Sequence, residues 1–237
     1  TFARHTRQLV APVLYDDGTL DESLLCPLRR LFPTLRCISK AEAIAKLDQH
    51  LPADRFPTLR ERCTNYPNLR KLIDPHLASS VWKLVIDSDL LFFRTPTLLL
   101  DWLSAPSQPL HAIDSETSYG YRRETLDRLA GHPLADLVNV GLCGLNSAEL
   151  DWEKLEHGCR ELIHAEGTHY YLEQALVAML VAGRACTVAP AGEYVTMPQL
   201  PEARSGRAVM HHYVAHSKRW SFQRNWRHAR AQASESL

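Results

Sequence analysis

Residues 81–89 read VWKLVIDSD, and this stretch decides the fold of the chain. Residues 81–87 are mostly apolar and rich in β-branched and aromatic side chains, which predicts a buried strand that ends in Asp87. Asp87 and Asp89 then stand at the carboxyl end of the strand, where open α/β sheets place their ligands. The apolar LLFF of residues 90–93 follows at once, so the acidic pair lies between two segments with the composition of a core.

Strand-like and helix-like stretches alternate before and after this strand. Further strands are predicted at residues 9–15, 35–39, 109–113, 140–146 and 208–213. Helices are predicted at residues 21–31, 41–48, 68–76, 96–103, 149–165 and 170–182, and from 217 onward. This alternation predicts an α/β fold, a single-domain α/β/α sandwich over residues 1–237 with a mainly parallel central sheet.

The composition excludes several classes of protein. With 237 residues, 45% hydrophobic content and no formal net charge, the chain can bury one substantial core and lacks the basic excess of a nucleic-acid-binding protein. No apolar run approaches the roughly 18–20 residues of a membrane span, and the N-terminus does not resemble a signal peptide. The six cysteines form no CxxC pair, which argues against a zinc ribbon and favours a reducing compartment. We therefore expect a soluble, cytoplasmic protein with no nucleic-acid partner.

Asp87 and Asp89 are candidate metal ligands. Two carboxylates separated by one residue can point to the same side of an extended chain. Their oxygens suit a hard divalent cation such as Mg²⁺ or Mn²⁺, which shares its remaining positions with phosphate. The competing interpretation is that Asp87 caps the turn and Asp89 is solvated. The apolar flanks weaken it, because an acidic pair between core segments is costly unless a positive charge neutralises it.

The same residues allow a second function. A hydrophobic strand that ends in Asp-x-Asp also opens the active site of haloacid-dehalogenase-like phosphohydrolases, with Asp87 as nucleophile and Asp89 as acid/base. That motif normally lies near the start of a chain and continues into a Thr or Val where this chain has Leu91. Its position in mid-chain counts against this alternative.

Residues 210–220 read MHHYVAHSKRW and hold a second group of candidates. His212 ends a predicted strand and Lys218 follows six residues later, so both side chains can reach one site for a metal ion and an anion. A neutral imidazole is a metal ligand, and a lysine is a point charge for phosphate oxygens. The competing interpretation is that a chain with 12 histidines clusters some by chance and that Lys218 is a surface charge.

Together these stretches resemble the retaining, glycogenin-like and lipopolysaccharide-galactosyltransferase-like glycosyltransferases, which have the nucleotide-diphospho-sugar transferase (GT-A) fold. The first motif of that family, a hydrophobic strand running into Asp-x-Asp and then apolar residues and a Pro, stands here at residues 81–96. The C-terminal motif, His-Phe-x-Gly-x-x-Lys-Pro-Trp, stands at residues 212–220 as HYVAHSKRW, with Trp220 in register. Ala215 replaces the glycine and Arg219 replaces the proline.

Weaker motifs lie between these two. LVNVGLCGLN at residues 137–146 resembles the family's Asn-x-Gly strand, and YLEQAL at 171–176 resembles its Asp-Gln-x-x-Leu segment. NLRKL at 68–72 matches the helix before the metal strand, whose basic residue reaches the sugar-nucleotide. The resemblance therefore implies this set of donor-binding residues: Lys71, Asp87, Ser88, Asp89, Asn139, Gly141, Gln174, His212 and Lys218.

The resemblance also implies a chemistry. Asp87, Asp89 and His212 would hold Mn²⁺ or Mg²⁺ against the diphosphate of a nucleotide-sugar, a UDP-sugar being the expected donor, and Lys218 would add charge to the same oxygens. Glu173 stands where the family has Asp and would stabilise the oxocarbenium-like state or orient the acceptor. The alternative is that Glu173 has no catalytic role and is a carboxylate in the first turn of a helix, where the helix dipole favours a negative charge.

Two further assignments keep their alternatives. Asp114 ends a predicted strand in the family's sugar-pocket region, where it either acts on the sugar or caps the strand. Asn139 either binds donor-sugar hydroxyls or holds a turn.

The resemblance leaves several acceptors open: a saccharide, a lipid-linked acceptor or a protein. Four arginines of the tail are most simply a solvated face, with peripheral contact to an anionic membrane as the alternative: Arg219, Arg224, Arg227 and Arg230. In the family a first strand and loop that hold the base and ribose precede the strand predicted at 9–15, and residues 1–8 are too short to supply them. The expectation is a GT-A fold lacking its first strand in this chain, with a non-catalytic relic that binds metal or sugar as a further alternative.

Overall fold

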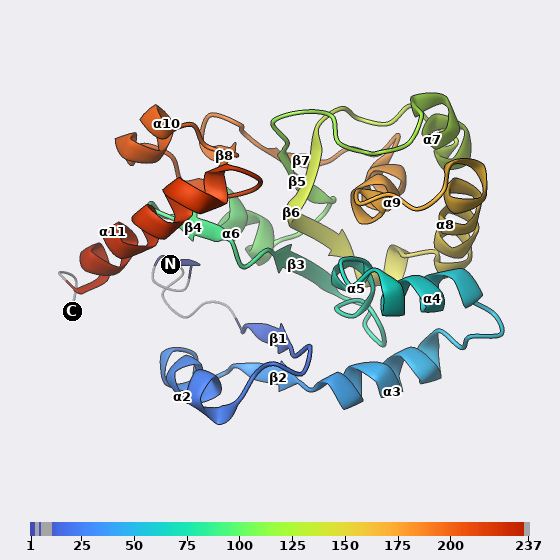
Figure 1. Cartoon of the computed structure of the whole chain (residues 1–237), viewed down its shortest axis with the longest axis horizontal. Helices are drawn as coiled ribbons and strands as arrows, with labels where there is room; N and C mark the ends of the chain where they lie inside the picture. The colour runs from blue at the N-terminus through green and yellow to red at the C-terminus, as the bar shows by residue number, and fades with distance from the viewer. Residues whose placement is uncertain (3–4, 6–10, 235–237) are drawn as a thin grey trace.

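The computed structural model describes residues 1–2, 5 and 11–234 and has an α/β fold. Its largest sheet has four strands in the order β3-β6-β5-β7. The bounds are β3 (Trp82–Ile86), β5 (Leu110–Ile113), β6 (Val138–Asn146) and β7 (Thr187–Ala189). The strands predicted at 81–87, 109–113 and 140–146 therefore exist, and the α/β class is confirmed (Figure 1).

The largest sheet is mixed, which corrects the expectation of a mainly parallel one. β6 is antiparallel to both of its neighbours, β3 and β5, and only β5 and β7 are parallel. β6 lies between β3 and β5 and runs opposite to both. The alternation of strands and helices along the chain indicates which segments are strands, but it does not indicate the direction in which each strand runs. The register of the β5–β6 pair shifts between His111 and Ala112, where the partner on β6 moves from Cys143 to Asn139, so the extra residues lie on β6.

A second sheet of three strands adjoins the site, in the order β4-β9-β8. Its strands are β4 (Leu90–Phe92), β8 (Tyr194–Thr196) and β9 (Met210–His212). β4 and β9 are antiparallel, and their register places Leu90 opposite His212. The apolar residues after Asp89 are thus a strand of their own, and the predicted strand at 208–213 is its partner.

The N-terminal part forms a two-stranded parallel sheet of β1 (Val13–Tyr15) and β2 (Arg36–Ile38). The helices α2 (Glu22–Leu31) and α3 (Lys40–His50) accompany this sheet at the lower edge of Figure 1. Asp21 caps α2, and Ser39 forms a capping box with Glu42 at the start of α3. Residues 6–10 lie outside the described residues, and so does the beginning of the strand predicted at 9–15.

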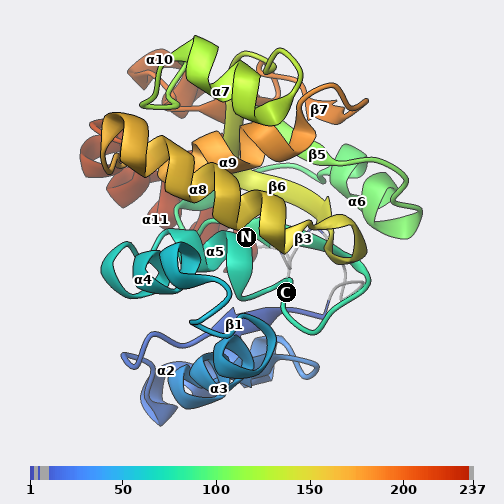
Figure 2. The ribbon, with the colours of Figure 1, turned by 90° about the vertical axis from the view of Figure 1, so that its right-hand side faces the viewer.

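The main core lies where helices cover the large sheet. α9 (Leu172–Val181) is buried at nearly every position and packs between β6 and α8 (Trp152–Glu166), as Figure 2 shows. α4 (Pro57–Asn65) packs against α8, and α5 (Leu69–Ile73) packs against α9. The N-terminal end of α9 and the α5 helix therefore lie beside the carboxyl end of β3.

The remaining helices complete the surface. They are α6 (Thr97–Ser104), α7 (Arg123–Ala130), the 3₁₀ turn η1 (Ser147–Glu149), α10 (Leu200–Ser205), the π-helical turn η2 (Lys218–Phe222) and α11 (Gln223–Ser234). The predicted helical tail is confirmed as η2 followed by α11. Within the described part of the chain, no helix combines the length and apolar character needed to cross a membrane.

Candidate functional site

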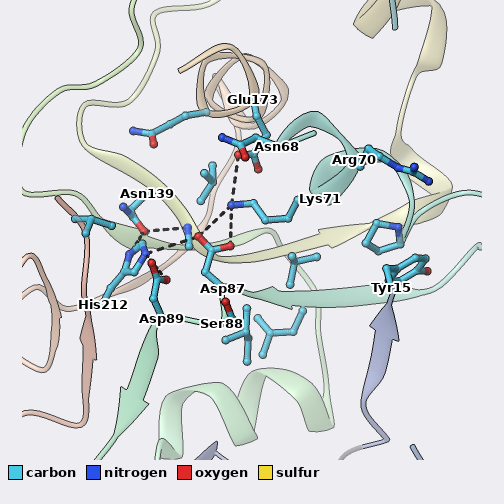
Figure 3. Close-up of a pocket in the computed structure, with 18 of the residues that line it drawn as sticks. Tyr15, Asn68, Arg70, Lys71, Asp87, Ser88, Asp89, Asn139, Glu173 and His212 are labelled. Carbon is cyan, nitrogen blue, oxygen red and sulfur yellow. Dashed lines mark hydrogen bonds and ion pairs between the residues drawn. The ribbon is translucent and has the colours of Figure 1, made fainter. Parts of the chain in front are cut away.

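A cavity of about 1360 Å³ opens at the carboxyl ends of β1 and β3. Its walls come from β1, α5, β3, β6, the start of α9 and the segment after β9. Figure 3 shows Lys71, Asp87 and Glu173 pointing toward one another near its centre, with Asp89 and His212 beside Asp87. Every residue that the sequence motifs singled out as donor-binding or metal-binding lines this cavity.

Asp87, Asp89 and His212 meet in this cavity. One ligand atom from each lies within 4.8 Å of the others, so a single metal ion could contact all three. His212 Nε2 is 3.4 Å from Asp89 Oδ1 and 3.7 Å from Asp87 Oδ2. Among the described residues, Asp89 Oδ1 and His212 Nε2 are buried polar atoms without a hydrogen-bond partner. Buried polar atoms are normally satisfied, so this oxygen and nitrogen fit a hard divalent cation.

The backbone brings these three residues together, although Asp87 and His212 are 125 positions apart in the sequence. The Asp87 N–H donates to the Gly141 carbonyl at 2.8 Å, which ties the end of β3 to β6. The Tyr213 N–H donates to the Asp89 carbonyl at 3.1 Å, which continues the pairing of β4 with β9. The register of these strands, more than the local sequence, determines where His212 lies.

Asn139 and Gly141 position the ring of His212. The Nδ1 of His212 is 3.1 Å from Asn139 Oδ1, and the Gly141 N–H donates to the same oxygen at 3.0 Å. Since Asn139 Oδ1 accepts, the proton of a neutral ring belongs on Nδ1 and Nε2 is left as a metal ligand. A Cβ on Gly141 would stand 2.1 Å from His212 Cε1, so only glycine leaves room for the ring.

Two lysines pair with the carboxylates. Lys71 Nζ is 2.9 Å from Asp87 Oδ1 and 3.4 Å from Glu173 Oε2, while Lys218 Nζ is 2.8 Å from Asp89 Oδ2. Burial would raise the pKa of Asp89, but its interactions with His212 and Lys218 outweigh this effect and lower the pKa to about 2. Asp89 is therefore ionised throughout the neutral range.

Glu173 is buried at the start of α9. Burial raises its pKa to about 7, because Lys71 only partly offsets the loss of water and the charge of Asp87 adds to it. Burial opposes the charge on Lys71 as well, but the carboxylates of Glu173 and Asp87 outweigh this and raise its pKa. The three side chains form one charged group in which Lys71 is the shared cation.

Asp114 and Gln174 are brought together at another wall of the cavity. Gln174 Nε2 donates to Asp114 Oδ2 at 2.9 Å, although 60 residues separate them. Ser88 is exposed in the turn between Asp87 and Asp89. The side chain of Trp220, which the C-terminal motif includes, lies outside the described side chains, as does that of Arg230.

The cavity also has lining residues that the sequence motifs did not indicate: Tyr15, Asp16, Arg70, Asp74 and Tyr171. Asp16 follows β1 as Asp87 follows β3, and this shared position at the carboxyl end of a strand was an available signal. Arg70 Nε donates to Asp74 Oδ2 at 2.8 Å, which leaves Asp74 Oδ1 buried and unpaired among the described residues.

The loop that presents Lys218 contains a strained residue. Ala215 has a φ of +46°, in the left-handed region that glycine adopts freely, and it stands where the C-terminal motif has glycine. Alanine at this position therefore costs backbone strain that glycine would not.

We expect Ala215→Gly to raise the free energy of unfolding by about 0.5–1 kcal/mol, since relief of left-handed strain exceeds the added entropy of the unfolded chain. Urea unfolding followed by tryptophan fluorescence measures this change. Ala191→Gly is the matched control: Ala191 is exposed and lacks a positive φ, so it should lose about 0.5 kcal/mol. Equal losses for both variants would contradict the strain at Ala215.

The phosphohydrolase alternative requires Asp87 to pair with a downstream lysine. The lysine that contacts Asp87 is Lys71, which precedes it in the chain, and the downstream Lys218 contacts Asp89 instead. The arrangement of charges therefore does not favour this alternative.

No protein-family model matches the chain, and a search of curated proteins found no match. Solved structures do match it. The galactosyltransferase LgtC in complex with donor and acceptor sugar analogues is 15% identical, with 97% of this chain and 88% of that chain covered at a TM-score of 0.56. An active-site mutant of LgtC is 14% identical, with 98% and 90% covered at a TM-score of 0.55.

A eukaryotic structure matches as well. Mouse xyloside xylosyltransferase 1 in its apo form is 13% identical, with 84% of this chain and 82% of that chain covered at a TM-score of 0.54. These likenesses confirm the resemblance inferred from the motifs at the level of fold: the chain has an LgtC-like GT-A glycosyltransferase fold.

Proposed function

We propose that this protein is a metal-dependent glycosyltransferase that transfers a sugar from a nucleotide-diphosphate donor to an acceptor. The observation that carries the proposal is the convergence of Asp87, Asp89 and His212, with Asp89 Oδ1 and His212 Nε2 buried and unpaired among the described residues. Likeness to two glycosyltransferases across most of their length supports the same reading.

Asp87, Asp89 and His212 are the residues that would hold Mn²⁺ or Mg²⁺. When bound, the ion supplies Lewis-acid stabilisation of the charge on the departing nucleoside diphosphate. Asn139 and Gly141 keep the ring of His212 in place, while Lys218, beside Asp89, supplies a positive charge for the phosphate oxygens. Such charges act without reorganisation because the fold already holds them.

The sugar end of the site is assigned to the remaining polar residues. Asp114 and Gln174 form a hydrogen-bonded pair on the cavity wall, which suits recognition of sugar hydroxyls. Glu173 is the proposed stabiliser of an oxocarbenium-like state, and Lys71 holds it beside Asp87. Because the motifs resemble those of the retaining glycosyltransferases, we also propose that the donor is a UDP-hexose and that the anomeric configuration is retained.

The cellular location, the domain organisation and the acceptor are also part of the proposal. All six cysteines are free, as suits a cytoplasmic location, and residues 1–237 are taken as one glycosyltransferase domain. Arg219, Arg224 and Arg227 are exposed on η2 and α11, where a lipid-linked acceptor would bring them near an anionic membrane. A free saccharide or a protein is the alternative acceptor.

A titration of UDP with and without Mn²⁺ tests the proposed site. We expect binding that requires Mn²⁺ and weakens by about 10- to 100-fold in Asp89→Asn, because the variant keeps the size of the side chain but loses its charge. Asp101→Asn removes an exposed carboxylate outside the cavity and should bind as the wild type does. UDP binding that ignores both Mn²⁺ and Asp89 would overturn the metal site.

A second measurement separates an enzyme from a binding relic. Slow hydrolysis of nucleotide-sugars, screened over UDP-, GDP-, ADP- and CMP-sugars, should depend on Mn²⁺ and disappear in Asp89→Asn. Metal-dependent binding without hydrolysis of any donor would favour the relic.

A further inference from the structure

The two lysines of the site differ in how firmly they are held. Lys71 is shared by Asp87 and Glu173, and its side chain is 25% exposed. Lys218 contacts one carboxylate, Asp89, and its side chain is 58% exposed. Lys71 is therefore held between two carboxylates. The ammonium group of Lys218 is largely exposed to water, so it can leave Asp89 for another anion without becoming an unpaired buried charge.

The oxygens of Asp89 are divided between two directions. Oδ2 contacts Lys218 at 2.8 Å, while Oδ1 faces His212 Nε2 at 3.4 Å and has no hydrogen-bond partner among the described residues. Oδ1 is thus the oxygen available to a metal ion, and Lys218 stands on the other side of the same carboxylate. Lys218 therefore does not lie where the metal ion would lie, and it acts on the ion through its positive charge.

The charges of the site explain what such a lysine does. The carboxylates of Asp87 and Asp89 are each paired with one ammonium group, so these four side chains are formally neutral, and Glu173, which shares Lys71, adds at most one negative charge. A divalent ion bound alone would leave at least one positive charge uncompensated in a partly buried cavity, where charges are weakly screened. A diphosphate brings the missing negative charge.

We propose that Lys218 is a place-holding cation, which neutralises Asp89 in the metal-free site and exchanges Asp89 for a diphosphate oxygen when metal and nucleotide bind together. This inference rests on the proposed function. Its consequence is that Lys218 opposes a free divalent ion and favours a diphosphate. Metal ion and diphosphate then strengthen each other's binding, and the coupling is reciprocal.

The test uses the metal alone first. Calorimetric titration of MnCl₂, checked by the EPR signal of free Mn²⁺, compares the wild type with Lys218→Met on the full chain. We expect Lys218→Met to bind Mn²⁺ about fivefold to tenfold more tightly, because one nearby positive charge is gone. Inorganic pyrophosphate, titrated at saturating Mn²⁺, should bind at least about tenfold more weakly to the same variant.

Tighter binding of Mn²⁺ together with weaker binding of pyrophosphate in Lys218→Met is the result that a place-holding lysine predicts. Lys218→Arg retains the charge and should bind Mn²⁺ as weakly as the wild type. Arg219→Met removes the adjacent exposed charge, which has no ion pair with Asp89 among the described residues, and should change Mn²⁺ affinity less than twofold. Because the Lys218 side chain is 58% exposed, its replacement should lower the temperature of thermal unfolding only slightly.

The outcomes distinguish this inference from the proposed function. If Mn²⁺ binding depends on Asp89 but Lys218→Met does not tighten it, the metal site stands and the place-holding role is overturned. If Lys218→Met weakens the binding of both Mn²⁺ and pyrophosphate, Lys218 supports the structure of the site and the inference fails. If Mn²⁺ binding is unaffected by Asp89→Asn, both the proposed function and this inference fail.

Discussion

Gly141→Ala will lower the affinity of the protein for Mn²⁺ by about 100-fold or more, although Gly141 is not itself a metal ligand. A Cβ at this position would lie 2.1 Å from His212 Cε1 and 2.6 Å from Nδ1, far inside contact distance. His212 is only 3% exposed, so neighbouring atoms enclose most of its ring and the added methyl group would push the ring out of its present position. The ring must leave Asn139, and Nε2 then no longer faces Asp89.

The same substitution will also destabilise the fold, by about 1–3 kcal/mol as for other overpacked cores. Gly144→Ala separates the two effects. It lies on the same strand, β6, and its Cβ would stand 2.6 Å from Trp102, away from the metal ligands. We expect Gly144→Ala to lower the free energy of unfolding and to leave Mn²⁺ affinity unchanged. Calorimetry and urea unfolding measure both quantities, and wild-type Mn²⁺ affinity in Gly141→Ala would show that His212 is not a ligand.

Lys71→Met will destabilise the metal-free protein by about 2–4 kcal/mol at pH 8.5, toward the lower end of the range for a broken buried ion pair because Lys71 and Asp87 are a quarter exposed. Without Lys71, Glu173 stays buried beside Asp87 with no cation to neutralise it. Urea unfolding in the presence of a chelator measures this loss.

The loss should depend on pH in a defined direction. The pKa of Glu173 is raised from 4.5 to about 7, so the folded protein binds the proton more tightly than the unfolded chain does. Its contribution to stability is therefore fully present below about pH 4.5 and is lost as the pH rises through 7. Removal of Lys71 raises this pKa further, so the difference between Lys71→Met and the wild type should be smaller at pH 5 than at pH 8.5, with the lost contact to Asp87 contributing at both.

A second substitution tests the origin of the effect. Glu173→Gln removes the buried charge and leaves Lys71 paired with Asp87, so it should be tolerated at pH 8.5. In the double variant Lys71→Met/Glu173→Gln, we expect most of the lost stability to return, a non-additivity that a double-mutant cycle measures directly. Destabilisation that is equal at pH 5 and pH 8.5 would mean that the charge of Glu173 is not the cause, and that the loss comes from the packing of Lys71 or its contact with Asp87.

The sequence alone was sufficient for the elements whose signal is local. The apolar run before Asp87 predicted β3, and the run at 140–146 predicted most of β6, because a buried strand needs apolar side chains wherever it lies. The helices α8 and α9 followed from their length and apolar content, with Gly183 at a φ of +71° close after α9. The ligand types Asp, Asp and His were visible for the same reason, since chemistry depends on residue identity.

Only the tertiary structure decided how these elements pair. Nothing in the local pattern of residues 138–146 reveals that β6 runs antiparallel to β3 and β5, because strand direction depends on segments far away in the chain. The short strand β4 gains its identity from β9, whose register sets Leu90 against His212. The close approach of Gly141 to His212 and the pairing of Lys218 with Asp89 depend on how β9 and the segment after it lie against β4 and β6. The sharing of Lys71 by Asp87 and Glu173 depends on the packing of α5 against α9 beside the end of β3. The sequence thus determined which groups this protein has for holding a metal ion and an anion, whereas their convergence depends on contacts between segments separated by many residues, whose geometry no local periodicity encodes.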